Sequence, residues 1–430
     1  MSELALHQQR ITILFLGVAH ALDHSFLVAL PPVLLLITGD LGVSLAEVGL
    51  AATVAYLLFG AGALIGGPLS DRIGEGKVVF ASLVLAGVST LILLVDRSYL
   101  SFVAMLALTA AWTSFYHPTA NSLISKRYPQ EMGRAMAIHG ICGSVGQVFV
   151  PSIAVFLALA AGWRFSFMFF GALSIIVSVY FLGQRRVERT EERRKSRKLV
   201  MLKNRRFWAL LVCNIMIGLY YRGAELFLPA YLTRLRGLSI EASGLAVSLL
   251  MAFGVLGQFL GGVGGDRIGN VRALVLESVA VAVGFIFLQL EGLAASAAFI
   301  VLFGVAFYAT QPTTNALTAE ITRPEERGFA YGVMFFTVFG LGSVSSTIAG
   351  EIAEVSGLQS AFSALSVFSV LALVSSLLLS KAWAASTGPS TRGSAVHAIE
   401  LMRAPALQGW KLGLKKAFIE QLRFVEARLK

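Results

Sequence analysis

The sequence contains the segment Gly67-Pro68-Leu69-Ser70-Asp71-Arg72-Ile73-Gly74, whose last four residues return 195 positions later as Asp266-Arg267-Ile268-Gly269. Other matches share this offset: Gly49-Leu50-Ala51 with Gly244-Leu245-Ala246, Gly66-Gly67 with Gly261-Gly262, Gly42 with Gly237, and Gly162 with Gly357. At an offset of 194, Pro118-Thr119 and Asn121 return as Pro312-Thr313 and Asn315. A four-residue identity on an offset shared with several other matches indicates an internal repeat.

The composition is that of a membrane protein. Of 430 residues, 56% are hydrophobic and 14% are charged, against about 25% charged in a typical soluble domain. Such a chain could not cover a soluble surface, so an ordinary cytosolic enzyme and a disordered protein are excluded. Its two cysteines, Cys142 and Cys213, lie in apolar runs, which excludes a disulfide scaffold.

Twelve apolar runs of about 20 residues each indicate transmembrane helices. They cover about 11–36, 46–68, 77–95, 99–124, 134–159, 163–182, 207–232, 242–264, 272–290, 294–318, 328–352 and 358–380. The sequence therefore predicts an all-α integral membrane protein with two six-helix parallel repeats. We expect an N-terminal half over 1–182, a basic linker over 183–206, a C-terminal half over 207–380 and a basic tail over 381–430.

The basic residues predict the orientation in the membrane. If the first helix starts in the cytoplasm, thirty of the 35 Lys and Arg residues fall on cytoplasmic segments and four on the other side. Eleven of the thirty lie between Arg185 and Arg206. This bias predicts two cytoplasmic termini in an inner or plasma membrane.

The repeated motif resembles the signature loop of the major facilitator superfamily, G-x-x-x-D-R-x-G followed by a basic residue, here Lys77 and Arg272. Within that superfamily the chain looks most like the fosmidomycin-resistance drug exporters, because Pro31-Pro32 follow the His and Asp residues of the first run, and Tyr116-His117-Pro118 lie in the fourth run. The resemblance implies transport by alternating access around a cavity lined by the first, fourth, seventh and tenth runs. It also implies a role in conformational gating for the motif residues Gly67, Asp71, Arg72, Gly262, Asp266 and Arg267. We expect the motif glycines to let two helices approach closely, and the acids on the cytoplasmic turns to cap a neighbouring helix N-terminus.

The first run carries His20, Asp23 and His24 on one helical face. Ionisable groups at this depth are costly unless they face a cavity or a partner. A carboxylate between imidazoles predicts a proton or substrate site. A structural polar cluster is the first alternative, and a transition-metal site is the second. Two histidines without a Cys or an HExxH pattern favour a metal only weakly, so no metal site is predicted.

Three further runs carry candidate cavity residues. In the seventh run, Arg222 could hold a substrate anion or Asp23, and Glu225 could carry a proton. Simple pairing of Arg222 with Glu225 is the alternative. The fourth and tenth runs match at His117 and Gln311, each followed by a proline that can bend a helix beside a cavity. The other candidates are Trp112, Tyr116, Tyr221 and Tyr308, whereas His139 is expected to be a satisfied interior histidine.

These residues favour a secondary transporter, coupled to protons, that exports a drug or organic anion. The alternatives are proton-coupled uptake of a small anion or metal ion, and a membrane sensor or scaffold that transports nothing. No phosphate loop or nucleophile-and-base motif indicates an enzyme, and no cofactor is expected. We expect a monomer whose partners are a small-molecule substrate, protons, the bilayer and anionic lipid at an amphipathic helix in the tail, with no nucleic acid.

Overall fold

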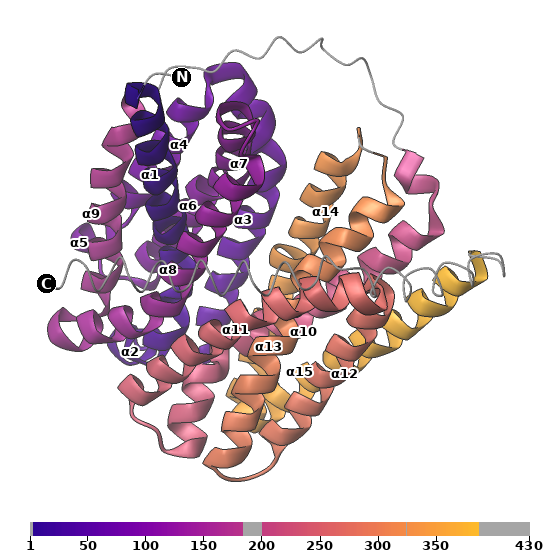
Figure 1. Cartoon of the computed structure of the whole chain (residues 1–430). Coiled ribbons are helices and arrows are strands. Elements are labelled where there is room, and N and C mark those ends of the chain that lie inside the picture. The colour runs from indigo at the N-terminus through magenta and orange to yellow at the C-terminus, as the bar shows by residue number, and fades with distance from the viewer. Residues whose placement is uncertain (1–2, 184–199, 324, 387–430) are drawn as a thin grey trace, which may run out of the picture. The chain divides into compact units, whose positions relative to one another are not determined.

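The computed structural model describes residues 3–183, 200–323 and 325–386, and every regular element in these ranges is a helix (Figure 1). The first helices are α1 (Glu3–Val28), α2 (Leu30–Leu41), α3 (Leu45–Ile73), α4 (Glu75–Ser89), α5 (Ile92–Val95), α6 (Tyr99–Thr113), α7 (Tyr116–Arg127), α8 (Met132–Ala161) and α9 (Trp163–Leu182). The later ones are η1 (Val200–Lys203), α10 (Arg205–Arg236), α11 (Ile240–Ile268), α12 (Asn270–Gln289), α13 (Leu293–Ile321), α14 (Arg327–Phe339), η2 (Leu341–Ser343) and α15 (Val344–Ser386).

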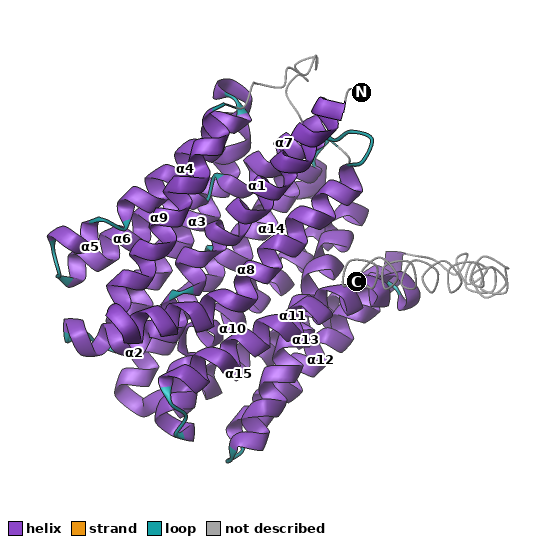
Figure 2. Cartoon of the chain, turned by 60° about the vertical axis from the view of Figure 1, so that its left-hand side comes forward, coloured by secondary structure: helices purple, strands orange, loops and turns teal. Residues whose placement is uncertain are grey.

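The helices fit twelve membrane crossings. Among the described residues, eleven helical segments are long and apolar enough to cross a bilayer. The last of them, Arg327–Ala384, has 58 residues, whereas about 20 are enough for one crossing. Gly357 interrupts it with φ 84° and ψ 162°, so this segment supplies two crossings. The prediction of an all-helical membrane fold is confirmed, and Figure 2 shows the helices side by side as a bundle.

The repeat is visible in backbone angles as well as in sequence. Gly74 and Gly269 both join one helix to the next with φ of 97° and 87° and ψ of 140° and 139°. Gly42 and Gly237 both end helices in the left-handed conformation, with φ of 65° and 70°. Positive φ strains residues with a Cβ, so these matched glycines fix equivalent turns in the two repeats.

The two matched prolines do not act alike. Before Pro118 the helix is interrupted between α6 and α7, as a proline bend predicts. At the repeated position, α13 continues through Pro312 as one helix.

Glycines in the seam between α3 and the start of α15 bring the two repeats into backbone contact. A Cβ at Gly49 would lie 2.3 Å from the carbonyl oxygen of Ser346, and one at Gly350 would lie 2.8 Å from that of Leu45. Hydrogen bonds also cross here, from the Thr53 hydroxyl to the Ser343 carbonyl (2.7 Å). We call this contact the glycine seam.

The motif glycines Gly67 and Gly262 do not make the close contact that the sequence analysis gave them. A Cβ at either position would meet open space. The preceding residues make that contact instead: a Cβ at Gly66 would lie 2.6 Å from Pro118, and one at Gly261 would lie 2.3 Å from the Ala309 carbonyl. A step of one residue turns about 100° around a helix, which accounts for the error.

The described residues up to Ser380 belong to one compact unit. Most of the basic linker, 184–199, and the amphipathic helix predicted in the tail lie outside the described residues. The predicted domain boundaries and the lipid contact of the tail therefore stay predictions.

The charged motif residues lie at the end of the bundle that the sequence predicts to be cytoplasmic. Asp71, Arg72, Asp266 and Arg267 are exposed. Asp71 pairs with Lys126 at 3.2 Å, while Lys126 also contacts the buried Glu75 at 2.5 Å. Loss of Asp71 would thus leave Lys126 paired, and an exposed ion pair contributes at most about 1 kcal/mol.

If Asp71 caps a helix in the opposite conformation, Asp71→Ala should destabilise that conformation by roughly 0.3–2 kcal/mol. The balance should then move several-fold towards the conformation described here. We would measure it by labelling Ser144→Cys, a cavity position, with an impermeant maleimide after replacing Cys142 and Cys213 with serine.

Glu131→Ala is the matched control, because Glu131 is an exposed carboxylate on the neighbouring turn, 3.5 Å from Arg134. Its labelling should equal that of the parent protein. Labelling and flux that stay at parental values in Asp71→Ala would show that the motif only shapes its turn.

Candidate functional site

A cavity of about 610 Å³ lies among α1, α3, α7, α8, α10, α11, α13 and α14. Its wall combines aromatic rings with polar side chains at membrane depth. Two hydrogen bonds that join the repeats, Leu45 to Glu354 and Ser152 to Ser248, lie towards the end opposite the charged motifs. Asn121, Asn315 and Tyr331 extend the wall towards the motif end, so the cavity reaches towards the predicted cytoplasm.

The structure brings most of the predicted site residues to this cavity. Eight of the eleven line it: His20, His24, His117, Tyr221, Arg222, Glu225, Tyr308 and Gln311. Asp23 lies behind the wall, fully buried. Tyr116 is buried too, and its hydroxyl donates to the Leu16 carbonyl at 2.5 Å. Trp112 does not line the cavity and lies beside Phe115.

Arg222 and Glu225 form a buried ion pair in the cavity wall. The guanidinium Nη1 donates to Oε2 of Glu225 at 2.6 Å, and the two side chains are 3% and 7% exposed. The Tyr221 hydroxyl donates to the other carboxylate oxygen at 2.7 Å. Such a pair is well satisfied, but removal of either partner would leave a buried charge.

Aromatic rings surround the guanidinium of Arg222. Its Cζ lies 4.2–4.5 Å from the ring centroids of Tyr56, Tyr221 and Phe339, which are cation–π distances. Its Nε has no hydrogen-bond partner among the described residues. The Tyr221 ring stacks on Phe307 at 3.6 Å, so the cationic head is held in a rigid aromatic frame.

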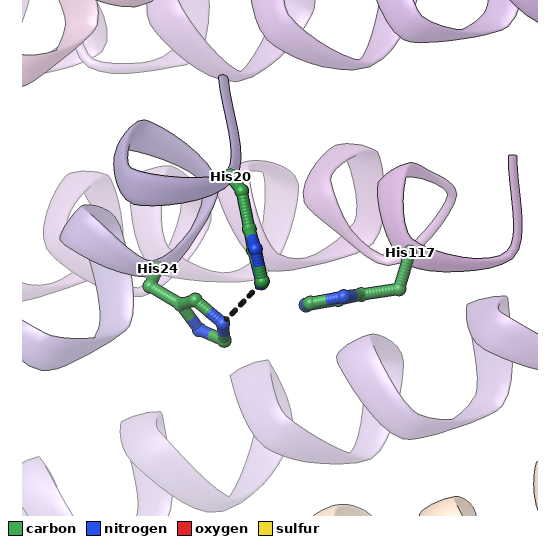
Figure 3. Close-up of side chains that lie close together, drawn as sticks. All are labelled: His20, His24 and His117. Carbon is green, nitrogen blue, oxygen red and sulfur yellow. Dashed lines mark hydrogen bonds between the residues drawn. The ribbon is translucent and has the colours of Figure 1, made fainter. Parts of the chain in front are cut away.

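A histidine cluster occupies another part of the wall, and its hydrogen bonds assign its protons. Nδ1 of His20 lies 2.8 Å from the backbone carbonyl of His139 and must donate to it. Nε2 of a neutral His20 is then an acceptor, and Nε2 of His24 donates to it at 3.0 Å (Figure 3). The His139 ring stacks on His20 at 4.1 Å and contacts the Tyr116 hydroxyl at 3.1 Å. His139 thus has interior partners.

Asp23 contacts His117 on α7, not Arg222. One carboxylate oxygen lies 3.2 Å from Nε2 of His117. Neither oxygen has a hydrogen bond of good geometry within the described part of the chain, although the side chain is fully buried. A buried carboxylate held by a single contact is energetically costly, so Asp23 stays a candidate site residue.

Several lining residues were not singled out by the sequence analysis. Tyr56 stacks on Arg222, and Gln258 donates to Gln311 at 3.2 Å. Asn214 donates from its side chain to the Met334 carbonyl at 2.8 Å. Asn121 and Asn315 also line the cavity. The last two were detectable, because they match in the repeat and are polar within apolar runs.

A bundle of twelve crossings around a polar central cavity defines a membrane transporter and not an enzyme. Residues 13–347 match the sequence profile of the Major Facilitator Superfamily, and the chain belongs to that superfamily.

The chain is also similar to known relatives and solved structures. The chain is 23% identical to the membrane sensor protein UhpC of Salmonella typhimurium, over 77% of this chain and 82% of that protein. It is 25% identical to a probable sulfoacetate transporter, SauU, of Cupriavidus necator, over 75% and 82%. It is also similar in fold to an inward-facing bacterial homologue of the lysosomal transporter Spinster, with a TM-score of 0.72, 19% identity, and coverage of 87% of this chain and 97% of that one.

Proposed function

We propose that this protein is a secondary transporter that moves a small organic anion by alternating access, together with protons. The buried Arg222 in the cavity wall is the observation that carries the proposal, because a guanidinium binds carboxylate, sulfonate and phosphate groups through paired hydrogen bonds. Relatives named for sulfoacetate, hexose phosphate and L-galactonate support an anionic substrate.

The Arg222–Glu225 pair supplies a coupling mechanism. A substrate anion that binds Arg222 displaces the carboxylate of Glu225, which keeps only its bond from Tyr221. A buried carboxylate that has lost its cationic partner is stabilised by taking a proton. Substrate and proton are then loaded together, which favours symport of an anion over the drug antiport that the sequence placed first.

The resemblance to fosmidomycin-resistance exporters, the proton-carrying role of Asp23 and the expected monomer stay predictions. So do the inner or plasma membrane and the cytoplasmic termini. Under this proposal the repeats rock about the glycine seam, and the motif end closes when the cavity faces the other side.

A membrane sensor is the second candidate, favoured by the likeness to UhpC. A sensor would bind an anion in the same cavity without moving it. Binding with no flux distinguishes the two functions.

The test is flux into proteoliposomes of labelled sulfoacetate, a hexose phosphate and L-galactonate, with and without a pH gradient. Symport predicts that acid on the substrate side accelerates accumulation and that a protonophore abolishes the acceleration. Antiport predicts the opposite sign, with acceleration when the acid side is opposite the substrate. Absence of flux for all three anions, together with export of a cationic or neutral drug, would contradict the proposal.

Neutralisation of the ion pair tests the role of Arg222. Either Arg222→Gln or Glu225→Gln should lower transport roughly 30-fold or more, because truncating one partner of a buried charge pair costs about 2–5 kcal/mol. The double variant restores neutrality but not the anion site, so it should remain inactive. Arg222→Lys should recover only part of the activity, since an ammonium lacks the planar fork.

Arg164→Gln with Asp40→Asn is the matched control. It removes an ion pair of 2.5 Å in which neither residue lines the cavity, and it should transport at the native rate. Native transport by the Arg222→Gln, Glu225→Gln double variant would instead remove Arg222 from the substrate site.

A further inference from the structure

Three histidine rings from two helices converge at the cavity wall. His20 and His24 lie one turn apart on α1, and His117 projects from α7 (Figure 3). Their potential ligand nitrogens all lie within 4.8 Å of one another. The third ring is the feature that the sequence could not supply, because it comes from a helix almost one hundred residues away.

We propose that His20, His24 and His117 bind one divalent first-row transition metal ion, with a remaining coordination position open to the cavity. Three protein ligands with an open fourth position are typical of zinc sites that exchange a ligand. Imidazole nitrogens suit Zn²⁺, Cu²⁺, Ni²⁺ and Co²⁺, whereas Mg²⁺ and Ca²⁺ prefer oxygen.

The hydrogen bond of His20 orients it for metal binding. Its Nδ1–H is held by the His139 carbonyl at 2.8 Å, so the lone pair on Nε2 points at the other two rings. Nε2 of His24 lies 3.0 Å from this nitrogen. Two ligands of a tetrahedral zinc ion, each about 2.0–2.1 Å from the metal, are roughly 3.3 Å apart. The α1 pair therefore needs little movement to share an ion, which would replace the proton between them.

Asp23 has the position of an orienting carboxylate for His117. Its oxygen lies 3.2 Å from Nε2 of that ring, which leaves Nδ1 as the ligand atom. Metal-binding histidines typically donate their second N–H to a carboxylate or a backbone carbonyl, and both kinds of acceptor are present here. This contact has no hydrogen bond of good geometry, so the proposal requires Asp23 or His117 to rotate when the ion binds.

Nearby charges are compatible with a cation. The guanidinium of Arg222 lines the same cavity, but Glu225 neutralises it at 2.6 Å. Asp23 is fully buried and adds a negative charge directly behind the cluster. The open position faces the cavity, where water or an anionic oxygen of a substrate can complete the coordination.

The experiment uses the full chain, purified in detergent and stripped of metal with a chelator. His7→Asn and His397→Asn are introduced first, so that only the four histidines of the cluster remain. Zn²⁺ titration should show one ion per chain, and Co²⁺ should give the visible absorption of a four- or five-coordinate site. His20→Phe and His117→Phe should each weaken Zn²⁺ binding at least about 100-fold. If one of these variants does not fold, His117→Gln is measured in its place.

Four matched variants separate ligation from packing. His139→Phe keeps the stacked ring and the backbone carbonyl, so it should retain the parental affinity. Asp23→Asn should lower affinity by about 10–100-fold with all three ligands present. Gly143→Ala, whose Cβ would lie 2.3 Å from the His20 ring, should weaken binding, whereas Gly140→Ala on the same helix meets open space and should not.

Zn²⁺ affinity that survives His117→Phe, or a Co²⁺ spectrum equal to that of the free ion, would overturn the proposal and leave the cluster a hydrogen-bonded packing element. Thermal melting and gel filtration confirm that each variant is folded. Because binding is measured without flux, failure here leaves the anion proposal standing, and failure of anion flux leaves the metal site standing.

Discussion

Every backbone N–H and C=O that enters the hydrocarbon of a bilayer must find a partner within the protein, and the rest of this structure depends on that constraint. It accounts for regular elements that are all helical in the described ranges and for breaks that fall at a few defined positions. The helix junctions at Gly74, Gly162, Gly269 and Gly357 all use positive φ, so one helix ends and the next begins with almost no exposed loop. The repeated Asp-Arg-Ile-Gly motif therefore contributes a glycine that allows the helix junction, in addition to its charged side chains.

The same constraint concentrates chemistry in the cavity. Polar side chains that face lipid would be costly, so the chain directs them inwards, where they pair. The Arg222–Glu225 pair on α10 and the contact of Asp23 with His117 between α1 and α7 are separate solutions to this problem. The first gives both carboxylate oxygens of Glu225 a donor, while Nε of Arg222 has no partner among the described residues. The second leaves a buried carboxylate under-bonded, and it lies beside the three histidines to which we assign a metal ion.

The fold could be predicted from the sequence because each membrane crossing requires a continuous apolar run, and because matching residues of the two repeats lie at a nearly constant offset. It reached Arg222 and Glu225 as a pair because i and i+3 positions on one helix are neighbours. It did not reach the contact of Asp23 with His117, since a pattern along the chain does not state which helices face each other. It placed Trp112 at the cavity and Gly67 in a helix contact, although small rotations about each helix axis decide such positions. Tyr56 and Gln258 are single polar residues without a motif, and only the packing gives them a role.

The glycine seam has a consequence for the energetics of motion. Side chains that interlock as ridges in grooves must withdraw from one another before two helices can part, and the activation barrier grows with each interlocked pair. At Gly49 and Gly350 the backbones meet almost without side chains between them. The helices meet there in close backbone packing, so their separation would break van der Waals contact and identifiable hydrogen bonds, such as that of Thr53 with Ser343. One repeat could therefore tilt against the other along this seam without first withdrawing interlocked side chains.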